Sequence, residues 1–316
     1  MLDTMQTNIK YLLFDIEGFP DRELILKTDE VKKLQAMAGY EFTIDTVLSE
    51  LRKADELKKK KLRKDQLSTK DADYYPITYQ LPLFISIVKI ADDYSFQGTS
   101  VLSAIREKAY EDDPIRGFHL LCRDFFRGWQ VYSKPKIVSF YGHVFDMPLL
   151  EFAALRSGSF AEVSDSFTEV FTKELLARKM KIAVSEKLHI DLYSDILSNF
   201  GANRFNKGIP VLAGILGSKR TISDDFDYRI FAENLYKARD FTRFESICQR
   251  RILDYYRIFL RIMRVTGGFG NTILDEELER ERVQQMKCWI ENAIENEQGS
   301  VLGFRKHLED WFSDSG

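Results

Sequence analysis

The 316-residue sequence contains only three cysteines, Cys122, Cys248 and Cys288, and they lie far apart. So few thiols at such spacings exclude a disulfide framework and a zinc site of the usual spacing. We expect all three to be ordinary buried thiols. Long apolar runs are also missing, because stretches such as residues 81–90 and 209–216 fall well short of the eighteen or so residues that cross a bilayer. We therefore expect no membrane span.

A strong excess of positive charge is absent as well. The formal net charge is −3 and the sequence pI is about 6.0, so the chain lacks the broad cationic surface of proteins that coat nucleic acid non-specifically. The start, MLDTMQTNIK, lacks the basic and apolar segments of a signal peptide, and we expect a cytoplasmic protein. With 44% hydrophobic and 13% aromatic residues, the composition is that of a folded globular protein.

The order of sequence patterns predicts an α/β sheet covered by helices. Short apolar segments of β-forming residues predict strands at 9–17, 82–90, 136–140 and 188–192. Helical patterns cover 114–130, a segment that opens at Met147-Pro148, a late segment through Ile252, and a charged segment from Asp275 to Phe312.

Residues 28–73 differ in character from the rest of the chain. They are rich in lysine and glutamate, with KADELKKKKLRKDQ at the centre, which predicts a charged helical insertion exposed to solvent. Residues 271–316 form a predicted C-terminal helical extension. Its Trp289 and Trp311 could dock it on the main body or on a protein partner.

The sharpest local pattern is the segment YLLFDIEG, residues 11–18. Residues two apart on a strand face the same side, so Asp15 and Glu17 would present two carboxylates roughly 7 Å apart. Buried carboxylates require a counter-charge, which an arginine, a lysine or a divalent metal can supply. The alternative is an ordinary strand end whose acids reach water at Gly18.

A third acid, Asp146, lies in the segment SFYGHVFDMPLLEFAALRSG. A strand there leads into a loop, and proline favours a helix start at Met147-Pro148. Asp146 is therefore expected at or beside the helix N-cap, a common place for aspartate. Capping and metal ligation are compatible, because a carboxylate has two oxygens.

The segments FDIEGFPD, FYGHVFDMPLL and HIDLYSDILSNFGA together resemble the predicted 3'-5' exonucleases related to the proofreading domain of family B DNA polymerases, within the DEDD superfamily. The resemblance covers roughly residues 10–264. It implies an RNase H-like mixed sheet flanked by helices in a domain of residues 1–270, interrupted by the insertion at 28–73 and followed by the extension at 271–316. The implied activity is hydrolysis at nucleic-acid 3' ends, with single-stranded ends as the expected substrate.

The resemblance also implies a metal site. In that family, an Asp-x-Glu pair and an aspartate in a Phe-Asp-x-Pro context hold two Mg²⁺ or Mn²⁺ ions, and the matching residues here are Asp15, Glu17 and Asp146. Two such ions can activate water and stabilise the leaving 3' oxygen. Tyr141, where relatives often have asparagine, and His143 are the expected substrate-binding residues.

The last family motif is altered. Family members carry a tyrosine four residues before a fourth aspartate on a late helix, and the alignment here places Ile247 and Arg251 at these positions. Arg251 also falls in the apolar row of its helix. It could leave the helix sideways. It could instead reach the three acids and supply the positive charge that metal would otherwise provide.

A shift of one helical turn would bring Asp254 to the metals as the fourth acid, with Arg250 at the tyrosine position. We consider this register less favourable than the Arg251 alignment. Two functions remain open. The first, which we favour from the sequence, is a metal-dependent 3'-5' exonuclease that uses the three acids and Asp254 with two ions. The second is an inactive exonuclease fold with one ion or none, which binds nucleic acid or protein.

Overall fold

The computed structural model describes residues 8–20, 80–105, 114–157, 169–170, 183–197, 239–268 and 272–296. The predicted insertion at 28–73 and Trp311 lie outside these residues. Within the described ranges, no helix is long and apolar enough to cross a bilayer.

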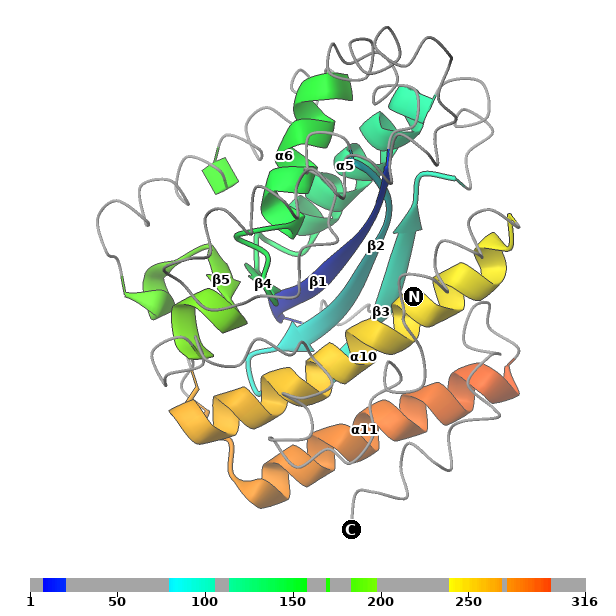
Figure 1. The fold of residues 1–316 in the computed structure, drawn as a ribbon. Coiled ribbons are helices and arrows are strands. Elements are labelled where there is room, and N and C mark those ends of the chain that lie inside the picture. Colours follow the sequence, from blue (N-terminus) through cyan, green and yellow to red (C-terminus); the bar gives the residue numbers. More distant parts are fainter. Residues whose placement is uncertain are drawn as a thin grey trace, which may run out of the picture.

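Five strands of the described residues form one mixed sheet in the order β3-β2-β1-β4-β5 (Figure 1). The strands are β1 Ile9–Pro20, β2 Gln80–Ala91, β3 Phe96–Ser103, β4 Lys136–Ser139 and β5 His189–Asp191. β1 is antiparallel to β2 and parallel to β4, β2 and β3 are antiparallel, and β4 and β5 are parallel. The prediction of a mixed sheet flanked by helices is confirmed.

Two features of the sheet differ from the sequence-based expectation. β1 continues to Pro20 instead of ending at Glu17, because a register shift after Glu17 lets Gly18 pair with Pro82 of β2. β3 was not expected. Its sequence, FQGTSVLS, is an edge strand that is mostly only half-buried, so it lacks the apolar run that reveals the central strands.

The two faces of the sheet are covered by different helices, as Figure 1 shows. Helices α5 (Pro114–Val131) and α6 (Asp146–Ser157) cover one face, and helices α10 (Phe241–Thr266) and α11 (Glu276–Glu295) cover the other. Side chains of β1 alternate between the two cores, as strand geometry requires: Leu12, Phe14 and Ile16 face α5 and α6, whereas Tyr11 and Leu13 face α10.

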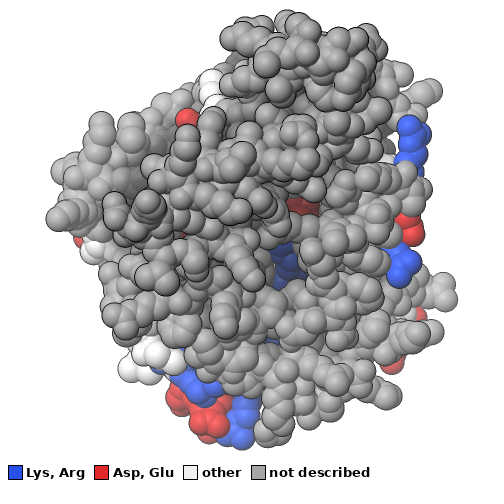
Figure 2. All heavy atoms as spheres, viewed as in Figure 1, with Lys and Arg blue, Asp and Glu red and all other residues white. Residues whose placement is uncertain are grey.

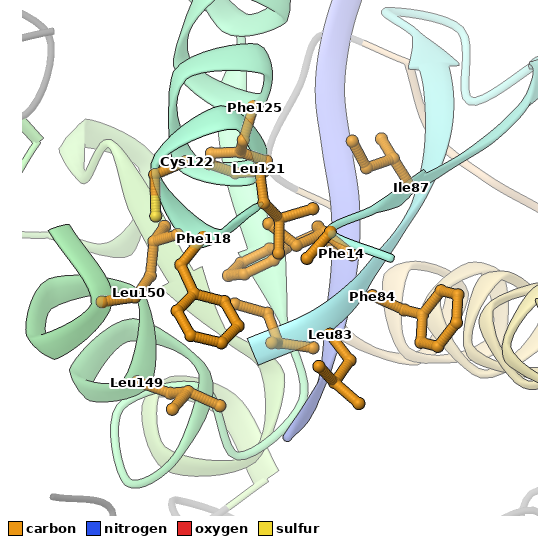
Figure 3. Close-up of a cluster of buried hydrophobic side chains, with 14 of the residues drawn as sticks. Phe14, Leu83, Phe84, Ile87, Phe118, Leu121, Cys122, Phe125, Leu149 and Leu150 are labelled. Atoms are coloured by element: carbon orange, nitrogen blue, oxygen red, sulfur yellow. The ribbon is translucent and has the colours of Figure 1, made fainter. Parts of the chain in front are cut away.

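The core beneath α5 is dense and aromatic (Figure 3). The ring of Phe14 on β1 packs against that of Phe125 on α5, with centroids 5.3 Å apart. Cys122 lies in the same core, and burial raises the pKa of its thiol to about 12, so it is unreactive at neutral pH. Cys248 is also buried, but Cys288 is exposed, which corrects the expectation that all three thiols are buried.

Helix α10 begins at an aspartate cap, where Asp240 accepts a hydrogen bond from the backbone N–H of Arg243. It ends at Gly267, whose φ of 80° favours glycine. Helix α11 then packs along it (Figure 1). Trp289 of α11 contacts Phe96 of β3 at a centroid distance of 5.3 Å, so this tryptophan does dock the C-terminal segment on the main body.

Replacement of Phe125 by alanine should destabilise the fold by about 3–5 kcal/mol, because it leaves a cavity against Phe14 in a core that cannot fully collapse. Urea unfolding of both proteins measures the difference. The matched control is Leu155→Ala on α6, where the side chain is 53% exposed and a change of no more than about 0.5 kcal/mol is expected. Equal losses for the two variants would contradict the assignment of Phe125 to the core.

Candidate functional site

Asp15 and Glu17 lie side by side on β1, on the face that α10 covers. They share this face with Tyr11 and Leu13 because residues two apart on a strand point the same way. Both acids are buried, with 2% and 8% of their surface exposed. Their position excludes the simple alternative of a strand end whose acids open to water.

The counter-charge for both acids is Arg251 on α10. Its Nη2 donates to Oδ1 of Asp15 at 3.0 Å and its Nη1 donates to Oε1 of Glu17 at 2.5 Å. The planar guanidinium therefore bridges the two carboxylates, a geometry that suits arginine better than lysine. Its side chain remains 24% exposed, so the ion pair lies at the edge of the core.

Tyr255 completes this cluster from one helical turn further along α10. Its hydroxyl accepts a hydrogen bond from Nε of Arg251 at 3.0 Å, and the guanidinium lies 5.5 Å from its ring centroid. Burial raises the pKa of Tyr255 well above its ordinary value, so the hydroxyl stays protonated. The sequence offers one signal for Tyr255, which is its spacing of four residues from Arg251 on the same helix.

Asp146 contacts β1 between the other two acids. It is the first residue of α6, and its Oδ1 accepts a hydrogen bond from the backbone N–H of Ile16, between the other two acids, at 3.2 Å. This contact ties the helix to β1, where the sequence had predicted a cap. Burial, together with the nearby charge of Asp15, raises the pKa of Asp146 well above its ordinary value.

Asp254 is buried on α10 but belongs to a neighbouring face of the helix. A step of three residues turns a helix by about 300°, so Asp254 points about 60° away from Arg251 and about 100° from Tyr255. Arg251 is therefore the residue of α10 that contacts the acids of β1, and Tyr255 contacts Arg251.

The donor set at this place does not fit a pair of divalent ions. Across the described ranges, no group of three or more His, Cys, Asp and Glu side chains is arranged to hold a metal. The carboxylates of Asp15 and Glu17 each give one oxygen to Arg251, so a divalent ion would have only their second oxygens, such as Oδ2 of Asp15, and would lie beside a positive guanidinium. Asp146 gives one of its oxygens to the backbone N–H of Ile16.

A second carboxylate, Asp191 at the end of β5, organises the loop that follows β4. It is fully buried, and it accepts hydrogen bonds from the backbone N–H groups of Tyr141, His143, Tyr193 and Ser194. The Ser194 hydroxyl also donates to it. Asp191 therefore joins the loop after β4 to the π-helical turn Leu192–Ile196.

His143 is held beside this loop by Asp195. Its Nε2 lies 3.3 Å from Oδ2 of Asp195, and Lys187 donates to the other oxygen of that carboxylate. Burial alone would raise the pKa of Asp195, but the hydrogen bonds from His143 and Lys187 hold it well below its usual range. Sequence reasoning missed both partners, because neither forms a recognisable motif with His143.

Replacement of Arg251 by glutamine should destabilise the fold by roughly 3 kcal/mol, since it leaves Asp15 and Glu17 buried without a counter-charge. This value is the low end for breaking a buried pair, because a quarter of the arginine is exposed. Adding Asp15→Asn and Glu17→Gln should recover most of the loss in urea unfolding. Arg243→Gln, at an exposed position on α10, is the control, and equal effects of the two arginine variants would refute the bridge.

Asp146→Asn should stabilise the protein at neutral and higher pH. A raised pKa in the folded state means that stability is fully present below the ordinary value of 3.8 and falls as pH rises through the raised pKa. The asparagine oxygen can still accept from Ile16. Unfolding followed at several pH values should show the variant gaining on wild type above pH 3.8 and matching it below.

Asp195→Asn is the opposite control. Because the pKa of Asp195 is lowered, its charge stabilises the fold above the ordinary pKa, and this stabilisation disappears as pH falls through the lowered value. This variant should therefore lose stability at neutral pH. If both variants respond to pH with the same sign, the assigned environments of the two carboxyl groups are wrong.

Comparison with known protein families places this site in context. The model of one family, described as a predicted 3'-5' exonuclease related to the exonuclease domain of PolB, matches residues 72–312. The matched segment contains Asp146, Arg251 and Asp254, whereas β1 precedes it. No curated protein and no solved structure gives a significant match. The matched residues make up most of the chain, and the protein belongs to this family of predicted exonucleases related to the PolB exonuclease domain.

Proposed function

We propose that this protein binds nucleic-acid 3' ends without hydrolysing them, because Arg251 takes the place of the catalytic metal ions. The observation that carries the proposal is the bridge from one guanidinium to Asp15 and Glu17. This function corresponds to the second of the two that the sequence left open. The family membership supports nucleic acid as the ligand.

The charge at the site supports this proposal. Two divalent ions bring four positive charges, which four carboxylates would balance. Here three carboxylates and one guanidinium carry at most two net negative charges, three minus one. Burial and mutual repulsion further favour the neutral form of Asp146, because its pKa is raised. The remaining charge is too small to hold two dications.

Repulsion between the Arg251 guanidinium and a divalent cation also opposes metal binding. Two unit charges 4 Å apart interact by about 4 kcal/mol at an effective dielectric constant of 20, and a dication beside a guanidinium experiences roughly twice that repulsion. The ion would also have to displace the hydrogen bonds that Arg251 gives to Asp15 and Glu17. Each effect opposes the ordinary metal chemistry of the family.

An active enzyme with Asp254 as the fourth acid is the competing function. It would require α10 to turn by about 60° about its axis, so that Asp254 replaces Arg251 opposite β1. Such a turn would break the contacts of Arg251 and Tyr255 and would move the apolar row of α10 away from the sheet. The packing of α10 therefore favours the non-hydrolytic function.

Access to the ion pair supports a role in binding. Arg251 keeps 24% of its side-chain surface exposed. In Figure 2, basic and acidic atoms of described residues are visible close together near the centre of one face of the molecule. A guanidinium is a common phosphate contact in proteins, and the pairing of Asp15 and Glu17 with Arg251, together with the raised pKa of Asp146, reduces the repulsion that a phosphate would meet here.

The test uses 3'-recessed, blunt and single-stranded oligonucleotides of DNA and RNA, labelled at the 5' end, with Mg²⁺ or Mn²⁺. The wild-type protein should bind the oligonucleotides and leave their length unchanged. Shortening from the 3' end by the wild type, abolished in the Asp15→Asn/Glu17→Gln variant, would overturn the proposal. Absence of binding to every oligonucleotide would overturn it as well.

Arg251→Asp tests the physical cause of the lost chemistry. This substitution restores a fourth acid and removes the competing cation, so divalent ions should stabilise the variant against thermal unfolding and leave the wild type unchanged. Arg243→Asp, elsewhere on α10, controls for the change of net charge. Equal stabilisation of the wild type by Mn²⁺ would show that Arg251 does not exclude metal.

A further inference from the structure

Two tyrosines form a stacked pair beside the site. The rings of Tyr141, in the loop after β4, and Tyr193, in the turn after β5, have centroids 3.8 Å apart and an interplanar angle of 21°. Both side chains are half-buried, so part of the pair is open to solvent. Of the two, the sequence pointed only to Tyr141.

One carboxylate oxygen fixes the backbone of both tyrosines. Oδ1 of Asp191 accepts a hydrogen bond from the N–H of Tyr141 at 3.0 Å and from the N–H of Tyr193 at 3.0 Å. Asp191 is itself fully buried at the end of β5. The two rings are therefore mounted on a rigid support before any ligand arrives, which lowers the entropy lost on binding.

The backbone at both positions is unusual. Tyr141 has a φ of 65°, in the left-handed region that side-chain-bearing residues seldom occupy. Tyr193 lies in a π-helical turn, Leu192–Ile196, a rare form that is frequently found at functional sites. Strain of this kind persists where the surrounding contacts enforce it, and here the contacts from Asp191 do so.

A row of aromatic rings connects the two stacked tyrosines to the ion pair of Arg251. Phe140 lies 6.0 Å from Tyr193 and 6.0 Å from Tyr255, measured between centroids. Tyr255 in turn accepts a hydrogen bond from Arg251. A ligand whose phosphate meets the guanidinium thus has an aromatic surface within the same part of the molecule.

We infer that Tyr141 and Tyr193 form a stacking platform for an unpaired nucleobase at a nucleic-acid 3' end. This inference rests on the proposed function and adds the part of the ligand that is recognised. Every base has a π-face, so an aromatic platform holds any base with little sequence preference. A paired base is already stacked and hydrogen-bonded in its duplex, and single-stranded or frayed ends are therefore preferred.

The test measures binding of a short oligothymidine, and of its ribonucleotide equivalent, with 2-aminopurine as the 3'-terminal base. Titrations are run in EDTA, so that the probe stays intact whatever the catalytic status of the protein. Stacking of 2-aminopurine on the tyrosines should quench its fluorescence. Tyr193→Leu and Tyr141→Leu should each weaken binding roughly tenfold and abolish the quenching. Tyr193→Phe should retain both.

Tyr132→Leu is the matched control, because Tyr132 is also half-buried but follows α5 and packs against the other core. Thermal unfolding identifies any leucine variant that has lost its fold, and Tyr193→Phe with a 5'-terminal 2-aminopurine probe then carries the test. Unchanged affinity and quenching in folded leucine variants would overturn the platform and leave the proposed function standing. A wild type that binds none of the probes would overturn the proposed function itself.

Discussion

The arrangement of the site depends on one guanidinium placed between two buried carboxylates. Asp15 and Glu17 must share a face because they are two apart on a strand, and that face is covered by α10. Two like charges in such a place destabilise the fold unless a cation joins them, and Arg251 does so with one hydrogen bond to each acid. Tyr255 accepts a further hydrogen bond from Arg251, and the charge of Asp15 contributes to the raised pKa of Asp146.

The second organising group is Asp191, and its chemistry differs from that of the first. It is a single buried carboxylate that backbone N–H groups from two segments and one hydroxyl satisfy. It thereby joins the loop after β4 to the turn after β5 and aligns the stacked tyrosines. Phe140 lies near both Tyr193 of the platform and Tyr255, which is bonded to Arg251, so one aromatic ring connects the two parts of the site.

Most of the central sheet could be predicted from the sequence because its strands are short apolar runs. β3 could not, since Gln97, Thr99 and Ser100 give an edge strand no apolar signature. In the site, the two-residue repeat of a strand predicted that Asp15 and Glu17 share a face. The helical repeat predicted that Arg251 lies on the apolar face of its helix. The hydrogen bond of Asp146 to β1 could not be foreseen, because capping explains an aspartate at a helix start equally well.

The sequence by itself determined which residue types stand at the family positions, including an arginine where a fourth aspartate is expected, and on which face of its own element each lies. That information is local, because strand and helix periods act over a few residues. Only the tertiary structure decided which element meets which: Arg251 lies more than two hundred residues from Asp15, and Tyr141 lies about fifty from the carboxylate that positions it. Such contacts depend on how sheet and helices pack together, which no local pattern records.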